Sequence, residues 1–414
     1  MKQKYSTTAA VLFALFTLLL SSCEQPDGPV GSGVGSEQGG QTYMGVFNVA
    51  QDTSFYNSDV KTGASAHIYI GKYEGILAEG LMKFYRPILP AQWTIDTAYV
   101  KIGFQGGIGT GGAINVASNL LDLEWSEAEP PALADLGALD QNNYPDPIAI
   151  TADSGVVAFP VNREWVDQWL RWENNFTEDD TTWTDTLRAD SSLTLHLFSD
   201  DEMPELLKRF RARGALTDTL RPRLFIQLTV EDTATGDTYP DMLMTTANAD
   251  IFLLENSNSN AVSDLLIGSG CAYQSNLRFD VSDIYARHDD YNVAVNKATM
   301  TIFRKREIAA NFPPTLSLWP FRLTDELGFT MPDSAGESGF VYISTAIDTT
   351  LDSLEIDVTI PASEWIRSVD KNHGIAIHSG TESLDINRMA FYSMEEQDTT
   401  LHPRLTLYYT EIPR

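Results

Sequence analysis

The sequence predicts an all-β protein built as two tandem antiparallel β-sandwiches. The first reason is that short runs with alternating apolar residues recur along the chain, among them "TAYVKIGF", "SLTLHLF", "RLFIQLTV" and "LEIDVTI". A period of two residues is typical of strands that bury one face. Clusters of Gly, Asp, Asn and Pro separate these runs, as turns between antiparallel strands require. The second reason is that the runs occur in the same order twice.

Six segments of the first half match six segments of the second half in order. "TAYVKIGF" matches "KATMTIF" when Ala98 is aligned with Ala298, "NREWVDQW" matches "ASEWIRSV", and "RPRLFIQL" matches "HPRLTLYY". The other three pairs are "IYIG" with "LLIG", "LMKF" with "NLRF", and "LTLHLFS" with "IAIHS". We therefore expect two copies of one unit, residues 43–232 and 240–414. The polar segment "EDTATGDTYPD" between them is typical of a linker.

Each copy is expected to contain one short helix around its Glu-Trp pair. In "REWVDQWLRWENN" the apolar residues Val166 and Leu170 are four positions apart, as are Trp165 and Trp169. This spacing predicts a helix that packs one apolar face against a sheet. Because Trp165 and Trp365 occur at matching positions in the two copies, we expect both to belong to the core.

The first 22 residues have the features of a bacterial lipoprotein signal peptide. Lys2 and Lys4 precede an apolar run at residues 9–20, and small residues lead from this run to Cys23. The pattern resembles a lipobox, which implies cleavage before Cys23 and acylation of Cys23. The alternative is an ordinary secretory signal. Residues 23–42 are expected to be a flexible tether, because they are rich in Gly, Ser and Pro and have few bulky apolar side chains.

The charge balance limits the partners. The chain carries 57 acidic and 28 basic residues, a formal net charge of −29. A strongly negative protein repels nucleic acid and anionic lipid, so neither is an expected partner. A solvated acidic surface explains this composition. Acidic loops could in principle bind Ca²⁺, which prefers carboxylate and carbonyl oxygens. The sequence contains no Asp-x-Asp-x-Asp-Gly loop, however, so we expect no cofactor.

Motifs of common enzyme classes are absent from the sequence. There is no Gly-x-Ser-x-Gly, His-Glu-x-x-His or Cys-x-x-Cys, and the six histidines are dispersed. Cys271 lies beside an alternating apolar run, which favours a small buried residue over a nucleophile. Gly107, Gly109 and Gly112 have the spacing of a dinucleotide-binding fingerprint. The residues after them predict a strand, however, whereas the fingerprint requires a helix there. We therefore expect no catalytic residues and no metal site.

The order of motifs in each copy resembles bacterial extracellular modules of the DNRLRE type. The shared elements are a strand with "IG", a basic-apolar pair ending in Phe, an Ala-led strand, a "W-x-E" element at "LEWSEAEPP", and closing strands such as "NHGIAIHS" and "PRLTLYYT". The resemblance covers most of both copies and is sharper in the second. It implies a jelly-roll-like fold similar to that of carbohydrate-binding modules. Some family members bind acidic polysaccharide, but the net negative charge here argues against an anionic glycan.

Two tryptophans are the candidate ligand-binding residues. Trp172 and Trp183 lie in "RWENNFTEDDTTWTDT", an acidic segment that has no counterpart of similar length in the second copy. Sugar rings stack on exposed aromatic faces, and the neighbouring Asn, Asp and Thr side chains can bind hydroxyl groups. The alternative is that both tryptophans cover the edge of the sandwich.

These observations predict a non-catalytic lipoprotein of the outer membrane or cell surface, held by an acyl anchor at Cys23. Its two sandwiches would bind polysaccharide or mediate surface adhesion. A second hypothesis is a structural or assembly lipoprotein that contacts a surface protein. A third is a polysaccharide lyase or glycosidase, for which carboxylates would have to face each other across a cleft.

Overall fold

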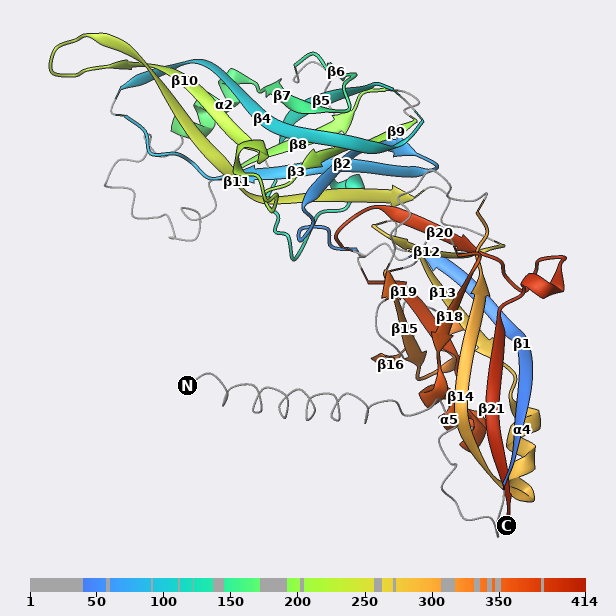
Figure 1. Cartoon of the computed structure of the whole chain (residues 1–414). Helices are drawn as coiled ribbons and strands as arrows, with labels where there is room; N and C mark the ends of the chain where they lie inside the picture. The colour runs from blue at the N-terminus through green and yellow to red at the C-terminus, as the bar shows by residue number, and fades with distance from the viewer. Residues whose placement is uncertain are drawn as a thin grey trace, which may run out of the picture.

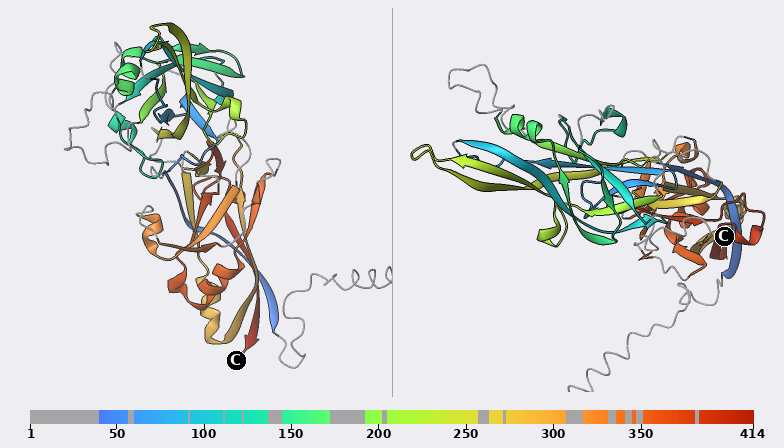
Figure 2. Two further views of the ribbon diagram at one scale, coloured as in Figure 1. Left: turned by 90° about the vertical axis from the view of Figure 1, so that its left-hand side faces the viewer. Right: turned by 90° about the horizontal axis from the view of Figure 1, so that it is seen from above.

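A computed structural model gives the structure of the chain. It describes residues 40–56, 60–90, 92–110, 112–121, 123–136, 145–171, 192–201, 205–256, 263–270, 273–306, 317–330, 336–340, 345–346, 351–380 and 383–414. Within these ranges the protein is mostly β-strand, and the pairings between strands are antiparallel. The predicted all-β class is confirmed. The strands form two sandwich-like bodies that follow one another along an elongated molecule (Figures 1 and 2).

The N-terminal body is a ten-stranded sheet that folds back on itself. Strand β11 pairs with β10 through its first half and with β3 through its second half, which joins the two layers. The strand order is β11 (Thr238–Asn256), β10 (Arg223–Glu231), β4 (Trp93–Gly109), β9 (Leu206–Arg211), β2 (His67–Tyr73), β3 (Ile76–Phe84), β8 (Leu193–Ser199), β5 (Ile114–Leu121) and β6 (Ile148–Ile150), with β7 (Ser154–Pro160) paired to β4.

The C-terminal body contains a nine-stranded and a two-stranded sheet. The order in the larger sheet is β16 (Glu337–Phe340), β15 (Ser317–Leu323), β19 (Ile375–Ser379), β13 (Tyr273–Phe279), β1 (Gln41–Tyr56), β21 (Arg404–Pro413), β14 (Tyr291–Phe303) and β18 (Ser353–Asp357), with β17 (Thr345–Ala346) paired to β15. The smaller sheet pairs β12 (Leu265–Ser269) with β20 (Asn387–Phe391).

Helices in the described part of the chain are short. They are α2 (Arg163–Arg171), α4 (Ser282–Ala286) and α5 (Thr359–Arg367), with single 3₁₀ turns η1 (Leu133–Leu136), η2 (Asp218–Leu220), η3 (Arg287–Asp289), η4 (Glu326–Phe329), η6 (Val369–Lys371) and η7 (Thr399–Leu401). None of the helices within the described ranges has the length and apolar character needed to cross a membrane. The glycine-rich segment joins β4 to β5 without a helix, so the prediction of a strand after it is confirmed.

The sequence matches correspond to equivalent positions in the two bodies. Ala98 on β4 pairs with Ile226 on β10, and Ala298 on β14 pairs with Leu407 on β21. The chain then returns to the same alanine in each body. The backbone N–H of Val161 donates to the carbonyl of Ala98 at 3.1 Å, and that of Val358 donates to the carbonyl of Ala298 at 2.9 Å. The two bodies therefore repeat one arrangement of strands, which explains why the chain contains the same closing motif twice.

The first strand of each copy lies in the opposite body. Strand β1 opens the first copy in sequence, but it pairs with β13 and β21 of the C-terminal body. Strand β11 opens the second copy, but it pairs with β10 and β3 of the N-terminal body. Figure 1 shows this placement for β1, which is blue and lies beside the red strand β21. The sheets therefore do not follow the expected boundaries 43–232 and 240–414.

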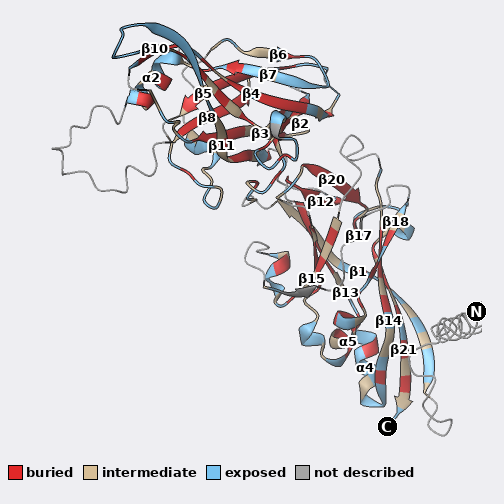
Figure 3. Ribbon diagram, turned by 60° about the vertical axis from the view of Figure 1, so that its left-hand side comes forward, coloured by how far each residue is buried: buried red, intermediate tan, exposed pale blue. Residues whose placement is uncertain are grey.

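The apolar core continues from one body into the other. The larger core cluster lies between the layers of the N-terminal body and also includes Leu266, Tyr273, Ile386 and Ala390 of the C-terminal body. Figure 3 shows buried residues along the strands on both sides of this junction. Polar contacts join the bodies at the same place, because Arg388 on β20 forms an ion pair with Glu74 in the β2–β3 turn. Packing and charge thus both connect the two sandwiches.

Candidate functional site

Helix α2 packs on strand β4 and separates an apolar face from a charged face. Asn162 caps the helix, since its Oδ1 accepts hydrogen bonds from the backbone N–H groups of Glu164 (2.9 Å) and Trp165 (3.3 Å). Val166 and Leu170 are fully buried in the N-terminal core, as their spacing predicts. Most of the remaining side chains of α2 are charged or polar and face solvent or β4.

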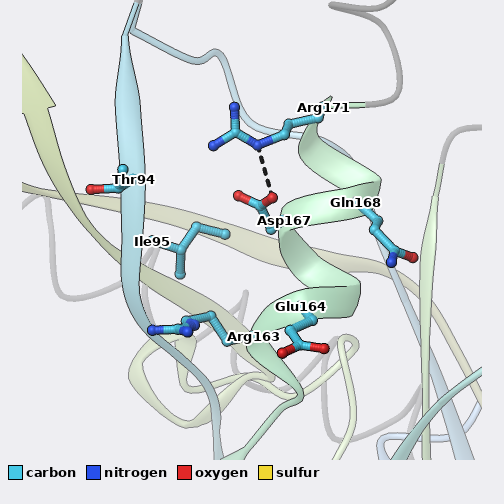
Figure 4. A pocket seen from close by; sticks show the side chains of 7 residues that line it. All are labelled: Thr94, Ile95, Arg163, Glu164, Asp167, Gln168 and Arg171. Carbon is cyan, nitrogen blue, oxygen red and sulfur yellow. Dashed lines mark hydrogen bonds and ion pairs between the residues drawn. The ribbon is translucent and has the colours of Figure 1, made fainter.

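An open cavity of about 460 Å³ lies between the charged face of α2 and strand β4. Figure 4 shows Arg171 and Arg163 at its two ends, with Asp167 between them and β4 opposite. The lining residues are Thr94, Ile95, Arg163, Glu164, Asp167, Gln168 and Arg171. The lining therefore offers two guanidinium groups, two carboxylates, an amide and a hydroxyl, which together can both donate and accept hydrogen bonds. We call this cavity the α2 pocket.

Arg171 is held in a fixed orientation at one end of the α2 pocket. Its Nε donates to Oδ2 of Asp167 at 2.8 Å, and its Nη2 donates to the carbonyl of Trp93 at 3.4 Å. The guanidinium carbon lies 4.4 Å from the centre of the Trp93 ring, within the range of a cation–π contact. Because Trp93 itself is buried in the core, its ring is a fixed surface against which the Arg171 guanidinium packs.

A second, smaller cavity of about 310 Å³ lies beside helix α5 of the C-terminal body. Its lining includes Glu364, the repeat counterpart of Glu164, and Arg322, which forms an ion pair with Glu364. Lys371, His373, Leu323 and Thr324 complete the lining. Residues of β15 line this cavity, whereas residues of β4 line the α2 pocket. The two copies therefore present different polar surfaces around equivalent helices.

The tryptophans of the two Glu-Trp pairs differ in burial, which corrects the prediction that both belong to the core. Trp365 is fully buried, but Trp165 is 38 % exposed. The reason is where each helix begins. Helix α5 starts at Thr359, five residues before Glu364, whereas α2 starts at Arg163, directly before Glu164. Trp165 therefore lies in the first turn of α2, whereas Trp365 lies in the last turn of α5.

The three predicted site residues, Cys23, Trp172 and Trp183, lie outside the described residues, and so does Cys271. Trp172 directly follows Arg171, the last residue of α2 and a lining residue of the α2 pocket. The sequence indicates a site in this part of the chain, but the pocket residues Arg163, Asp167, Gln168 and Arg171 were not among the predicted ones. The spacing of Asp167 and Arg171, four residues apart, was a usable signal for an ion pair on one helix face.

The basic residues of the matching segments "LMKF" and "NLRF", Lys83 and Arg278, each contact an aromatic ring. Nζ of Lys83 donates to the carbonyl of Trp125 at 2.6 Å and lies 5.3 Å from the centre of the Trp125 ring. The guanidinium carbon of the matching residue Arg278 lies 5.4 Å from the Phe329 ring. Trp125 belongs to the "LEWSEAEPP" element and is buried. The ammonium group of Lys83 is thus already bound to Trp125, so it does not form part of a basic groove for an anionic ligand.

Asp250 and His67 are among the groups of the N-terminal body whose pKa values are strongly shifted. Burial raises the pKa of Asp250 to about 6, although the backbone N–H of Arg213 donates to its carboxylate. Burial lowers the pKa of His67 to about 4, with a further contribution from the positive charge of Arg209. Nη1 of Arg211 lies 3.2 Å from Nε2 of His67, so a neutral ring can accept this hydrogen bond. Neither residue lines the α2 pocket.

Among the residues that the structure describes, His, Cys, Asp and Glu side chains form no group of three or more with a geometry suited to a metal ion. No family model and no curated protein sequence matches the chain. The site must therefore be interpreted from its own geometry.

Proposed function

We propose that the protein is a non-catalytic lipoprotein of the cell envelope that binds carbohydrate at the α2 pocket. An acyl anchor at Cys23 would hold it on the outer membrane or cell surface, with residues 23–42 as the tether. The sandwiches would act as jelly-roll-like binding modules, in keeping with the resemblance to DNRLRE-type modules.

The observation that carries this proposal is the mixed polar lining of the α2 pocket. Sugar hydroxyl groups both donate and accept hydrogen bonds, so a sugar site needs donors and acceptors close together. Arg163 and Gln168 supply donors, and Glu164 and Asp167 supply acceptors on the same helix face. Trp172, directly after the helix, adds an aromatic ring for stacking in this proposal.

The charges of the pocket favour a neutral glycan. Two arginines balance two carboxylates within the lining, whereas the whole chain has a net charge of −29. An anionic polysaccharide would have to approach a strongly negative protein, and Lys83, which matches a basic position of the family pattern, is already covered by Trp125. A neutral sugar meets no such repulsion.

A glycan array tests the proposal. The chain from Glu24 to Arg414 is screened against neutral and acidic glycans at moderate salt with and without Ca²⁺, beside the variant Trp172→Ala/Trp183→Ala. We expect binding to neutral glycans that the double substitution abolishes. Absence of binding by a protein with an intact β-sheet spectrum would contradict the proposal. Mass analysis of the bound glycans also detects cleavage, which would point to a lyase or glycosidase.

A second candidate function is a structural or assembly lipoprotein, and one feature favours it. Matching positions of β1 and β11 carry exposed apolar side chains, Met44 and Val46 in one strand and Met242 and Met244 in the other. Exposed apolar residues that recur on the outer strands of both bodies suit contact with a protein. Capture of a surface protein that Met44→Ser/Val46→Thr prevents, together with no glycan binding, would support this function instead.

A further inference from the structure

Strands β1 and β11 occupy equivalent places in the two bodies. Asn48 on β1 pairs with Arg404, as Thr246 on β11 pairs with Arg223. One step further, Val49 pairs with Phe279, as Ala247 pairs with Phe84. Strand β1 thus runs along β21 and then along β13, and β11 runs along β10 and then along β3. Each body requires one such strand to complete its sheet.

The two bodies obtain this strand in different ways. Strand β11 follows β10 directly through a short turn, so the N-terminal body is completed by the next segment of the chain. The C-terminal body is completed by β1, whose own continuation leads into β2 of the other body. Strand β1 therefore lies in one body while the chain that follows it belongs to the other body.

The contacts that hold β1 are specific to its sequence. Val49 is buried in the C-terminal core, and the ring of Tyr43 stacks on that of Tyr409 with centres 5.6 Å apart. The hydroxyl of Ser54 lies 2.6 Å from that of Ser275, and it accepts a hydrogen bond from the backbone N–H of Leu266 at 2.8 Å. All these contacts join β1 to the C-terminal body, so any strand of the same sequence makes them equally well.

Each half of β1 has one paired neighbour and one open side, although the strand as a whole lies between β13 and β21 in the sheet order. Over residues 41–48 β1 pairs with β21, and over residues 49–56 it pairs with β13, so each segment is held by one ladder within the described strands. Met44 and Val46 on its outer face are exposed. On the other side of the connection Thr62 and Ser65 are anchored, since the Oγ1 of Thr62 accepts from the N–H of Phe252 at 2.9 Å and the Oγ of Ser65 donates to the carbonyl of Leu384 at 2.7 Å.

We propose that two copies of this chain associate by exchanging β1. The β1 of each copy completes the C-terminal body of the other, and both sheets keep every contact they have in the single chain. Exchange of an identical element between copies costs little, because the contacts are the same and only the connection changes its path. The partner is therefore a second copy of the same chain, and this inference does not depend on the proposed carbohydrate binding.

Disulfide trapping tests the exchange in the chain from Glu24 to Arg414 with Cys271→Ser. The hydroxyl oxygens of Thr42 on β1 and Thr410 on β21 are 3.1 Å apart, so Thr42→Cys/Thr410→Cys places two thiols in bonding range. A bond within one chain leaves a monomer on a non-reducing gel, whereas an exchanged strand gives a covalent dimer. The matched control is Thr94→Cys/Thr229→Cys, because these two residues are direct partners across β4 and β10, which lie in one body and stay in one chain.

We expect a covalent dimer whose fraction rises with the protein concentration during refolding for the Thr42/Thr410 pair and stays at background for the control. Monomer alone for both pairs at every concentration would overturn the proposal. A second measurement avoids cysteines: two full chains with different affinity tags are refolded together and co-purified. An excess of a peptide with residues 41–56 should abolish co-purification, and the same peptide with Val49→Asp should not. Failure to co-purify, or equal effects of both peptides, would also overturn the exchange.

Discussion

The hydroxyl of Tyr69 on β2 donates a hydrogen bond to Oδ1 of Asp385, which lies 316 residues later in the chain. This bond crosses from the N-terminal body to the C-terminal body at the place where the apolar core is continuous. Burial raises the pKa of Tyr69, and the adjacent carboxylate of Asp385 raises it further, so the hydroxyl keeps its proton and remains a donor. A partly buried, charge-assisted hydrogen bond therefore joins the two bodies at the junction.

The first prediction concerns this junction. Tyr69→Phe should lower the free energy of unfolding by about 1.5–3 kcal/mol, because it removes a hydrogen bond to a charged group and leaves the carboxylate less satisfied. Urea unfolding followed by fluorescence and by circular dichroism measures the effect. Tyr239→Phe is the control, since Tyr239 is exposed and its substitution should change stability by less than about 0.5 kcal/mol.

The shared core also predicts one unfolding transition for the wild-type chain, with both probes coincident. Two separate transitions, together with an unchanged midpoint in Tyr69→Phe, would show that the bodies unfold independently and would contradict this account of the junction.

A second prediction compares the two tryptophans of the repeat. Trp365→Ala should cost about 3–5 kcal/mol because it empties a fully buried site, whereas Trp165→Ala should cost less than about 1 kcal/mol. Chemical denaturation of the two variants under one condition gives the difference. Equal losses would mean that the protein buries Trp165 in the first turn of α2 as fully as it buries Trp365 in the last turn of α5.

A third prediction follows from Asp250. Its folded pKa of about 6 lies above the ordinary value of 3.8, so the folded state binds more protons between these values and stability falls as the pH rises from about 4 to about 6. Asp250→Asn should therefore raise stability at pH 7.5, by on the order of 2–3 kcal/mol, and change it little at pH 4. Melting curves at both pH values measure the gain. A variant that destabilises the protein equally at both would contradict the prediction.

For His67 we expect the opposite dependence of stability on pH, over nearly the same pH range. Its folded pKa of about 4 lies below the ordinary value of 6.5, so the unfolded state binds the proton first and stability is lost as the pH falls from about 6.5 to about 4. In His67→Gln this loss should be absent, so its melting temperature should gain on the wild type between pH 7.5 and pH 4.5. A constant difference between the two proteins across this range would show that His67 titrates normally.

The sequence supported the strand content and the repeat because both depend on local patterns. The alternation around Ala98 and Ala298 placed two central strands correctly, and the matching "PRL" segments identified the closing strands. The placement of β1 in the C-terminal body and of β11 in the N-terminal body could not be predicted in the same way. An alternating strand specifies a buried face, not the body that receives it, and the two equivalent bodies offer equivalent partners.

The candidate site was predictable only in part. The charged face of α2 follows from helical spacing, and Pro361 near the start of α5 was a signal that this helix begins earlier than α2 relative to the Glu-Trp pair. The packing of Arg171 on Trp93 was not predictable, because Trp93 lies 78 residues before Arg171 in the chain and only the fold brings the two together.

Binding at the α2 pocket can be measured by calorimetric titration of the glycan selected by the array into the chain from Glu24 to Arg414. The variant Arg163→Ala/Gln168→Ala removes one cation and one amide from the α2 pocket. The control Lys72→Ala/Gln227→Ala also removes one cation and one amide, from exposed positions elsewhere in the N-terminal body. We expect binding to be at least about tenfold weaker, or ~1.4 kcal/mol, for the pocket variant, and the Kd of the control to be unchanged. Equal affinities for both variants and the wild type would show that the α2 pocket does not bind the glycan.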